Sequence, residues 1–127
     1  MKVYKDANLD MRFDLNDKVM IGKFLKNYVL LKETAQFTGG IELLSPKGVM
    51  LDLSEVEDME NYAKSILEDD LTLQLKGHGV RKFALVKSRS DKLNNFVMSL
   101  FEGDKKPEKL EIAEFDSADD ALIWLKS

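Results

Sequence analysis

The chain has 127 residues, of which 44% are apolar and 33% are charged, a composition that excludes disorder as its main state and fits one domain spanning residues 1–127. A net charge of −4 argues against nucleic acid and anionic membranes as partners, because both require a dominant basic surface. The absence of cysteine excludes disulfides, thiolate metal sites and cysteine nucleophiles, and a single histidine, His78, excludes a multi-histidine metal site.

The first predicted elements are two strands that form an antiparallel hairpin. Residues 11–15 alternate between apolar and polar, which is typical of a half-buried strand, and residues 19–24 form the second strand after a tight turn. We interpret residues 26–44 as a helix with a weak middle. Tyr28, Leu31 and Ala35 follow helical spacing, whereas a glycine pair interrupts the pattern and leaves the conformation of residues 36–44 open.

The middle of the chain predicts a central strand followed by an acidic helix. Residues 49–53 form a compact apolar run, which is typical of a strand covered on both faces. Ser54 can cap the next helix, whose first turns carry acidic residues of the sign that a helix N-terminus favours. That helix is expected to run to Lys76 and to end at the glycines of residues 77–79.

The last third predicts two further strand-helix units. Residues 82–86 form a strand, and Ser90 caps a strongly amphipathic helix that ends at Gly103. Residues 110–115 form the last strand, and Ser117 begins the last helix. The resulting order, β-β-α-β-α-β-α-β-α, predicts an α/β fold with a mixed sheet, in which the N-terminal hairpin is antiparallel and helices pack on the sheet.

This pattern resembles the STAS domain superfamily, and within it the SpoIIAA-like proteins, over nearly the whole length. The resemblance is carried by VMLDLS at residues 49–54, by KFALV at residues 82–86 and by FDSADDALIWL at residues 115–125. These are patterns of size and polarity, so they imply a fold more strongly than an activity.

The resemblance implies a regulatory role through protein contacts. In the best-known members, an Asp-Ser-Ser-Gly stretch at the start of a helix carries a phosphorylated serine. The corresponding stretch here is residues 60–63, and Tyr62 occupies the phosphoserine position, which a serine kinase cannot modify. The usual phosphoserine switch is therefore not expected, and Ser54 and Ser65 are weak substitutes for it.

Two groups of residues are candidate sites. Ser88, Arg89 and Ser90 lie where a strand gives way to a helix, so their hydroxyl and guanidinium groups could bind a phosphate or carboxylate; the alternative is an ordinary helix cap. Ile123 and Trp124 fall outside the buried stripe of the last helix and are interface candidates.

A possible apolar pocket is the third feature. Tyr28, Phe37, Phe96, Met98 and Phe101 could line a cavity between helices and sheet, or they could simply be core residues.

We therefore expect a cytoplasmic, non-enzymatic interaction module that forms a homodimer and binds a protein partner. We expect no catalytic residues, cofactor or metal, no nucleic-acid partner and no integral membrane segment. The alternative is a protein that binds a small apolar or lipid-like ligand, and a third, weaker interpretation is an anion or nucleotide sensor at residues 88–90.

Overall fold

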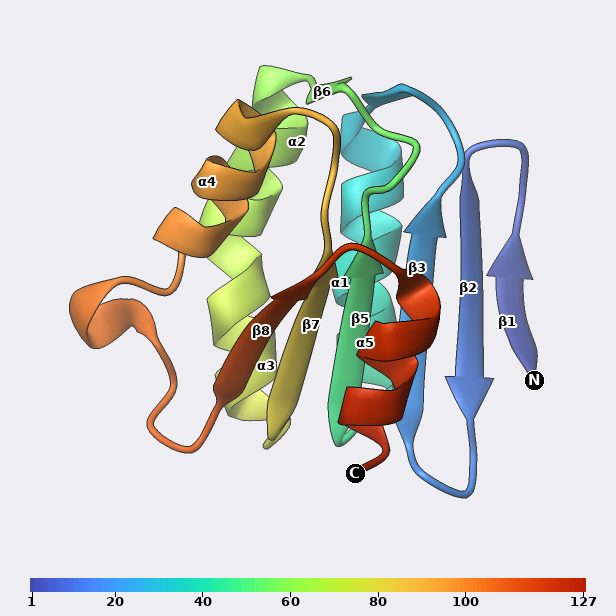
Figure 1. Cartoon of the computed structure of the whole chain (residues 1–127), viewed down its shortest axis with the longest axis vertical. Coiled ribbons are helices and arrows are strands. Elements are labelled where there is room, and N and C mark those ends of the chain that lie inside the picture. Colours follow the sequence, from blue (N-terminus) through green and yellow to red (C-terminus); the bar gives the residue numbers. More distant parts are fainter.

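The computed structural model describes residues 1–127 and contains a six-stranded mixed sheet, a two-stranded sheet and helices on both faces of the larger sheet (Figure 1). The large sheet has the order β1-β2-β3-β5-β7-β8, in which β2 is antiparallel to both neighbours and β3, β5, β7 and β8 are parallel. The strands are β1 (Lys2–Lys5), β2 (Leu9–Asp14), β3 (Val19–Phe24), β4 (Tyr28–Val29), β5 (Gly48–Asp52), β6 (Asp58–Met59), β7 (Lys82–Val86) and β8 (Glu111–Phe115).

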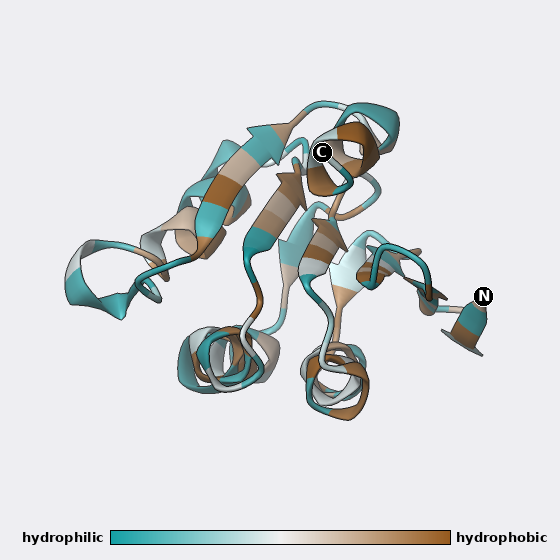
Figure 2. Ribbon diagram, turned by 90° about the horizontal axis from the view of Figure 1, so that it is seen from below, coloured by the Kyte–Doolittle hydropathy of each residue, from teal (hydrophilic) through white to brown (hydrophobic).

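Helices form a layer on each face of this sheet. The chain contains α1 (Leu31–Leu44), α2 (Asn61–Ile66), the π-helical segment η1 (Leu67–Leu71), α3 (Thr72–Gly77), α4 (Asp91–Ser99), the short 3₁₀ turn η2 (Gly103–Lys105) and α5 (Ala118–Leu125). Figure 2 shows α1 and the continuous α2-η1-α3 helix on one side of the sheet and α5 on the other. No helix combines the length and the apolar character needed to cross a membrane.

Most of the predicted strands and helix termini are confirmed, although α4 ends at Ser99, before the predicted end at Gly103. Residues 82–86 form β7, and the central position predicted for residues 49–53 is occupied by β5, whose residues are all buried. The Ser90 hydroxyl accepts a hydrogen bond from the N–H of Leu93, and the Ser117 hydroxyl accepts one from the N–H of Asp120. These side chains satisfy helix N–H groups that would otherwise lack partners, so they set where α4 and α5 begin.

The prediction that Ser54 caps an acidic helix is wrong. The helix begins at Asn61, and residues 54–60 form a loop and the short strand β6. The N–H groups of Glu57 and Asp58 donate to the carbonyl of Asn27, and the N–H of Glu60 donates to that of Val29. Hydrogen bonds to a segment distant in the sequence therefore replace those of a helical turn. The predicted order of elements also lacked the strands β1, β4 and β6.

The prediction for residues 26–44 is partly wrong. Residues 28–29 form β4, and α1 then runs unbroken through both glycines to Leu44, which settles residues 36–44 as helical. The predicted buried face of this helix was also wrong, because Tyr28, Leu31 and Ala35 are exposed. The buried face of α1 consists of Glu33, Thr34, Phe37, Thr38, Gly40 and Ile41.

The π-helical segment has a physical cause that is visible in the sequence. Ala63, Leu67, Leu71 and Leu75 are fully buried and recur every four residues. An α-helix turns through about 40° more than a full circle in four residues, so a regular helix would carry this stripe progressively away from the sheet. The wider π turn at residues 67–71 compensates for that drift and keeps the four side chains in the core.

Two hydrophobic cores lie on opposite faces of the sheet. The larger one lies under α1, α2-η1-α3 and α4 and includes Phe24, Phe37 and Phe83. The smaller one lies under α5, where Ala121 and Leu125 are buried. Because α5 is the only helix on its face, parts of the sheet there are less covered.

The loop between β1 and β2 depends on an ionised carboxylate. The Tyr4 hydroxyl donates to Asp6 Oδ2 (2.5 Å), and the N–H groups of Asn8 and Leu9 donate to Oδ1 (2.7 and 2.9 Å). These bonds, the one from Tyr4 first, lower the pKa of Asp6 below its ordinary value of 3.8. The carboxylate therefore stabilises the fold fully above that value, and the contribution is lost as the pH falls through the lower pKa of the folded state.

We expect Tyr4→Phe to lower the free energy of unfolding by about 1 kcal/mol or less at neutral pH, because one partly exposed charge-assisted hydrogen bond is lost. The difference from wild type should shrink as the pH falls below 3.8, the ordinary pKa of the Asp6 carboxyl. Urea unfolding at neutral and acidic pH measures this. A difference that persists unchanged in acid would show that Tyr4 acts through packing rather than through Asp6.

Candidate functional site

The carboxyl ends of the parallel strands meet at one end of the molecule, which is the upper end in Figure 1. There, the segments after β3, β5 and β7 are joined by hydrogen bonds. In open α/β sheets, small ligands often bind at this end. It holds two of the features singled out in the sequence, the Ser88 to Ser90 segment and Tyr62.

A buried polar network connects the loops after β5 and β7. The Asn94 amide accepts from the Ser88 N–H and donates to the Ser88 carbonyl, both at 2.8 Å, and the Ser88 hydroxyl donates to the carbonyl of Val56. Ser88 and Asn94 are 6% and 5% exposed. The network therefore fixes residues 54–60 relative to the start of α4.

The hydroxyls predicted to bind an anion already have partners within the protein. The Ser88 hydroxyl also accepts from the N–H of Ser90, and the Ser90 hydroxyl caps α4. Arg89 is exposed and lines a cavity of about 220 Å³ together with Glu55 and Glu57. Anion binding at Ser88, Arg89 and Ser90 remains a prediction. Arg89 is the one cationic group of the three residues, and the carboxylates of Glu55 and Glu57 lie beside it.

Four large apolar side chains gather at the same end of the molecule. Tyr28 is 48% exposed, Leu30 44%, Leu31 41% and Tyr62 73%. We call these four residues the tip patch. Exposed apolar residues are ordinary when they are scattered, so their gathering at one end is the informative observation.

The tip patch is held together by backbone pairing rather than by chance proximity. Strands β4 and β6 are parallel, with Tyr28 opposite Asp58 and Val29 opposite Met59. The Leu31 N–H donates to Glu60 Oε1 at 2.8 Å, and the Glu60 N–H donates to the carbonyl of Val29. Glu60 therefore joins the start of α1 to the start of α2, where Tyr62 lies in the first turn.

Acidic residues on the loop after β5 border the tip patch, and the exposed Lys26 and Lys32 lie next to Tyr28 and Leu31 in the sequence. Glu57 and Asp58 are exposed on the loop beside Tyr28, and Glu55 is exposed nearby. Asp58 lies 3.7 Å from Lys64 and Glu55 lies 3.8 Å from Lys23, whereas Glu57 has no ion-pair partner. An apolar centre with an acidic border favours a partner that carries apolar and basic residues together.

The sequence pointed to Tyr62 but not to the rest of the tip patch. Tyr28 and Leu31 were expected to face the core because their spacing is helical. No local signal marks Tyr28 as exposed, because it lies in β4, which forms only by pairing with β6, a segment distant in the sequence.

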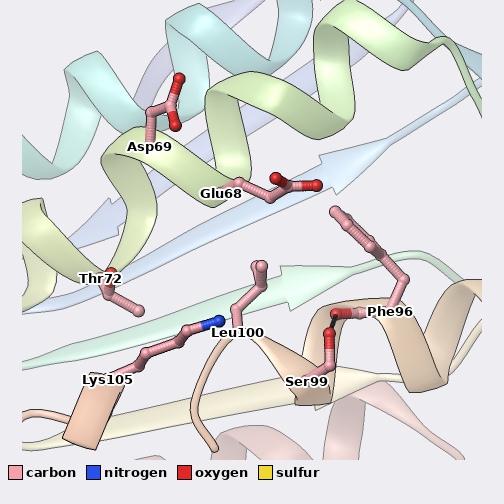
Figure 3. A pocket seen from close by; sticks show the side chains of 7 residues that line it. All are labelled: Glu68, Asp69, Thr72, Phe96, Ser99, Leu100 and Lys105. Atoms are coloured by element: carbon pink, nitrogen blue, oxygen red, sulfur yellow. Dashed lines mark hydrogen bonds between the residues drawn. The ribbon is translucent and has the colours of Figure 1, made fainter.

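The largest cleft lies elsewhere, between η1 and α4 (Figure 3). It measures about 510 Å³ and is lined by Glu68, Asp69, Thr72, Phe96, Ser99, Leu100 and Lys105. Figure 3 shows the two carboxylates on one wall, the Phe96 ring on the other and the Lys105 ammonium between Thr72 and Leu100.

The cleft holds no activated nucleophile. The Ser99 hydroxyl donates to the carbonyl of Phe96 at 2.6 Å, and the imidazole of His78 is hydrogen-bonded to Ser45 instead. No group of three or more carboxylate or imidazole side chains lies close enough to hold a metal ion. The polar walls suit a hydrated contact more than an apolar ligand.

The aromatic residues considered for an apolar pocket lie in different surroundings. Phe37 is fully buried and packs against Phe24, and Phe101 packs against Phe83. Phe96 lines the polar cleft, and Tyr28 is at the tip. Met98 is partly buried against the larger core.

The two interface candidates on α5 differ in exposure. Ile123 is 71% exposed, whereas Trp124 is partly buried. The Trp124 ring packs on Phe115 with centroids 5.5 Å apart, and the Lys82 ammonium lies 5.2 Å from its ring centroid. Ile123 is therefore the more accessible of the two for a contact between copies, and the homodimer remains a prediction.

Comparison with known proteins bears on the fold. No family model matches the chain, and no curated protein matches it significantly. A solved structure of an uncharacterized protein of the DUF3478 family with a SpoIIAA-like fold, from Shewanella loihica PV-4, is 18% identical, with a TM-score of 0.59 over 97% of this chain and 98% of that chain. The sequence resemblance is thus confirmed at the level of the fold, and the chain has a SpoIIAA-like fold.

Proposed function

We propose that this protein is a non-catalytic interaction module that binds an amphipathic segment of a partner protein at the tip patch. The observation that carries the proposal is the gathering of Tyr28, Leu30, Leu31 and Tyr62 over the starts of α1 and α2. Exposed tyrosine side chains on a fixed framework are typical of protein contacts, because they bury large apolar areas with little loss of conformational entropy.

The acidic border defines the chemistry of the partner. A second copy docking on the tip patch would present the same acidic border and not a complementary basic one. A helix with an apolar stripe flanked by lysine or arginine instead complements both the centre and the border. Tyr62 stands where the resemblance places a phosphoserine, and its large apolar face and hydroxyl suit a protein contact that needs no phosphorylation.

The test uses a labelled amphipathic helical peptide of leucine and lysine, titrated with the full chain and followed by fluorescence anisotropy. We expect saturable binding that the double substitution Leu31→Ser with Tyr62→Ser weakens at least about tenfold. The matched control is Leu43→Ser with Leu73→Ser, since these leucines are 77% and 62% exposed outside the tip patch. All four substitutions are at exposed sites and should leave stability nearly unchanged.

Equal weakening by the patch and control variants, or no saturable binding, would overturn the proposal. Light scattering on the same variants measures the oligomeric state and so tests whether a second copy of the chain occupies the tip patch. A dimer that dissociates on substitution of the tip patch would assign the patch to self-association and contradict a separate partner. A dimer that dissociates only with Ile123→Asp would leave the tip patch free for the partner.

A further inference from the structure

The end of the molecule opposite the tip patch is basic. Three neighbouring parallel strands, β3, β5 and β7, are each preceded by a basic residue, namely Lys18, Lys47 and Arg81. The register aligns them, because Val19 pairs with Gly48 and Gly48 pairs with Lys82. We call these three residues the basic row.

The backbone fixes the spacing of the basic row. The N–H of Lys47 donates to the carbonyl of Lys18 at 2.8 Å, and the N–H of Arg81 donates to the carbonyl of Lys47 at 2.8 Å. Neighbouring strands lie about 4.8 Å apart, so the row extends over about 10 Å. Figure 2 views the molecule from this end.

The cations of the row lack ion-pair partners. Elsewhere, Lys23, Lys64 and Lys87 each pair with a carboxylate, whereas none lies within ion-pair distance of Lys18, Lys47 or Arg81. Two further cations adjoin the row but are already engaged: Lys82 donates to the Trp124 carbonyl, and Lys126 pairs with Asp14 at 2.8 Å. Three cations without an ion-pair partner therefore lie side by side at the amino ends of β3, β5 and β7.

Two residues of the basic row, Lys47 and Arg81, line a concavity, and Lys18 lies outside its lining. A cavity of about 210 Å³ is lined by Asp17, Lys47, Arg81, Lys82, Leu125, Lys126 and Ser127. Its volume corresponds to about seven water molecules, which suits a small ligand rather than a macromolecule. Asp17 is its one acidic residue, and it lies 3.7 Å from the Lys126 ammonium.

Lys18 has a left-handed backbone, with φ 55°, a region that glycine or asparagine occupies at lower energy. The turn therefore carries a strained lysine where a smaller residue would be more stable. Such strain at an exposed site is explained if the side chain has a task that glycine cannot perform.

We propose that the amino ends of β3, β5 and β7 bind a small ligand that carries two linked phosphate groups. Arg81 can hold one phosphate through paired N–H donors, while the lysine ammonium groups of Lys18 and Lys47 neutralise the other charges. Two linked phosphate groups are short enough for both of their charges to lie within the length of about 10 Å over which the basic row extends. The source of the diphosphate is either free pyrophosphate or the diphosphate of a nucleotide.

Isothermal titration calorimetry at low ionic strength tests this with pyrophosphate, ADP, orthophosphate and citrate. We expect pyrophosphate to bind at least about tenfold more tightly than orthophosphate or citrate and to weaken with added salt. ADP matching pyrophosphate would show that a nucleotide can supply the diphosphate, and ADP failing to bind would assign the site to free pyrophosphate. Citrate matching pyrophosphate, or no measurable binding, would overturn the proposal.

Variants separate binding from folding. Lys47→Gln and Arg81→Gln should each weaken pyrophosphate binding about tenfold, whereas Arg89→Gln at the opposite end should not. Lys18→Gly should raise the melting temperature by relieving the left-handed backbone and should still weaken binding. Equal losses for Arg81→Gln and Arg89→Gln, or full affinity in Lys18→Gly, would contradict the assignment.

Discussion

Replacing Asn94 with alanine should lower the free energy of unfolding by about 3 to 4 kcal/mol, which is the largest loss expected for any single polar side chain here. Its amide satisfies both the N–H and the carbonyl of Ser88, and both residues are buried. Alanine removes both partners at once and leaves the N–H and the carbonyl of Ser88 unpaired. Leaving a buried backbone group unpaired costs about 1 to 3 kcal/mol.

Asn95 provides the matched control because it is the next residue on α4 and is exposed. Urea unfolding followed by circular dichroism should show a large loss for Asn94→Ala and a change within about 0.5 kcal/mol for Asn95→Ala. Similar midpoints for the two variants would show that the amide of Asn94 is not what holds Ser88.

The same substitution has a consequence for the tip patch. The Ser88 hydroxyl donates to the carbonyl of Val56, so the network that Asn94 anchors also holds the loop carrying Glu57 and Asp58. Asn94→Ala should therefore weaken binding of the amphipathic peptide even under conditions in which the variant remains folded. Hydrogen exchange should report faster opening of residues 54–60 in that variant.

Replacing Gly22 with alanine is expected to cost about 2 to 3 kcal/mol. Gly22 lies in the middle of β3, buried beneath α1, and a methyl group there would overlap the ring of Phe37, which is fully buried. An aromatic ring in a packed core cannot yield as a flexible chain can, so the helix or the strand must shift.

Two glycines in α1 serve as controls with different outcomes. A methyl group at Gly39 meets nothing, so Gly39→Ala should stabilise the protein by about 1 kcal/mol through helix propensity. A methyl group at Gly40 meets the end of the Met11 side chain, which is flexible, so Gly40→Ala should cost less than Gly22→Ala. Denaturant midpoints rank the three variants.

Rescue tests the mechanism at Gly22. Adding Phe37→Leu to Gly22→Ala removes the ring that the methyl group meets, so the double variant should be more stable than the sum of the single changes predicts. Simple additivity of the two changes would show that the loss at Gly22 comes from the strand backbone rather than from contact with Phe37.

Sequence features that act over a few residues predicted their elements correctly. The compact apolar run at residues 49–53 predicted a central strand, because a strand covered on both faces has no polar side, and residues 82–86 were predicted as a further strand. Ser90 and Ser117 predicted helix starts because their hydroxyls bond to N–H groups only three residues away.

The same local signals failed where distant segments competed. The acidic residues after Ser54 favour the start of a helix, yet the chain forms β6 there because the carbonyls of Asn27 and Val29 accept the N–H groups that a helix would leave unsatisfied. The four-residue spacing from Ala63 to Leu75 is a sequence sign of the π turn. Only packing against the sheet, however, makes a π turn more stable there than a regular helix.

By itself, the sequence determined the SpoIIAA-like fold and most of its strands, because hydrophobic pattern and capping act over a few residues. The tertiary structure decided where the two candidate surfaces lie. Strand pairing between β4 and β6 places Tyr28 and Leu31 at the same end of the molecule as Tyr62, and the parallel register aligns Lys18, Lys47 and Arg81. Neither arrangement follows from sequence spacing, because hydrogen bonds between distant strands determine both of them.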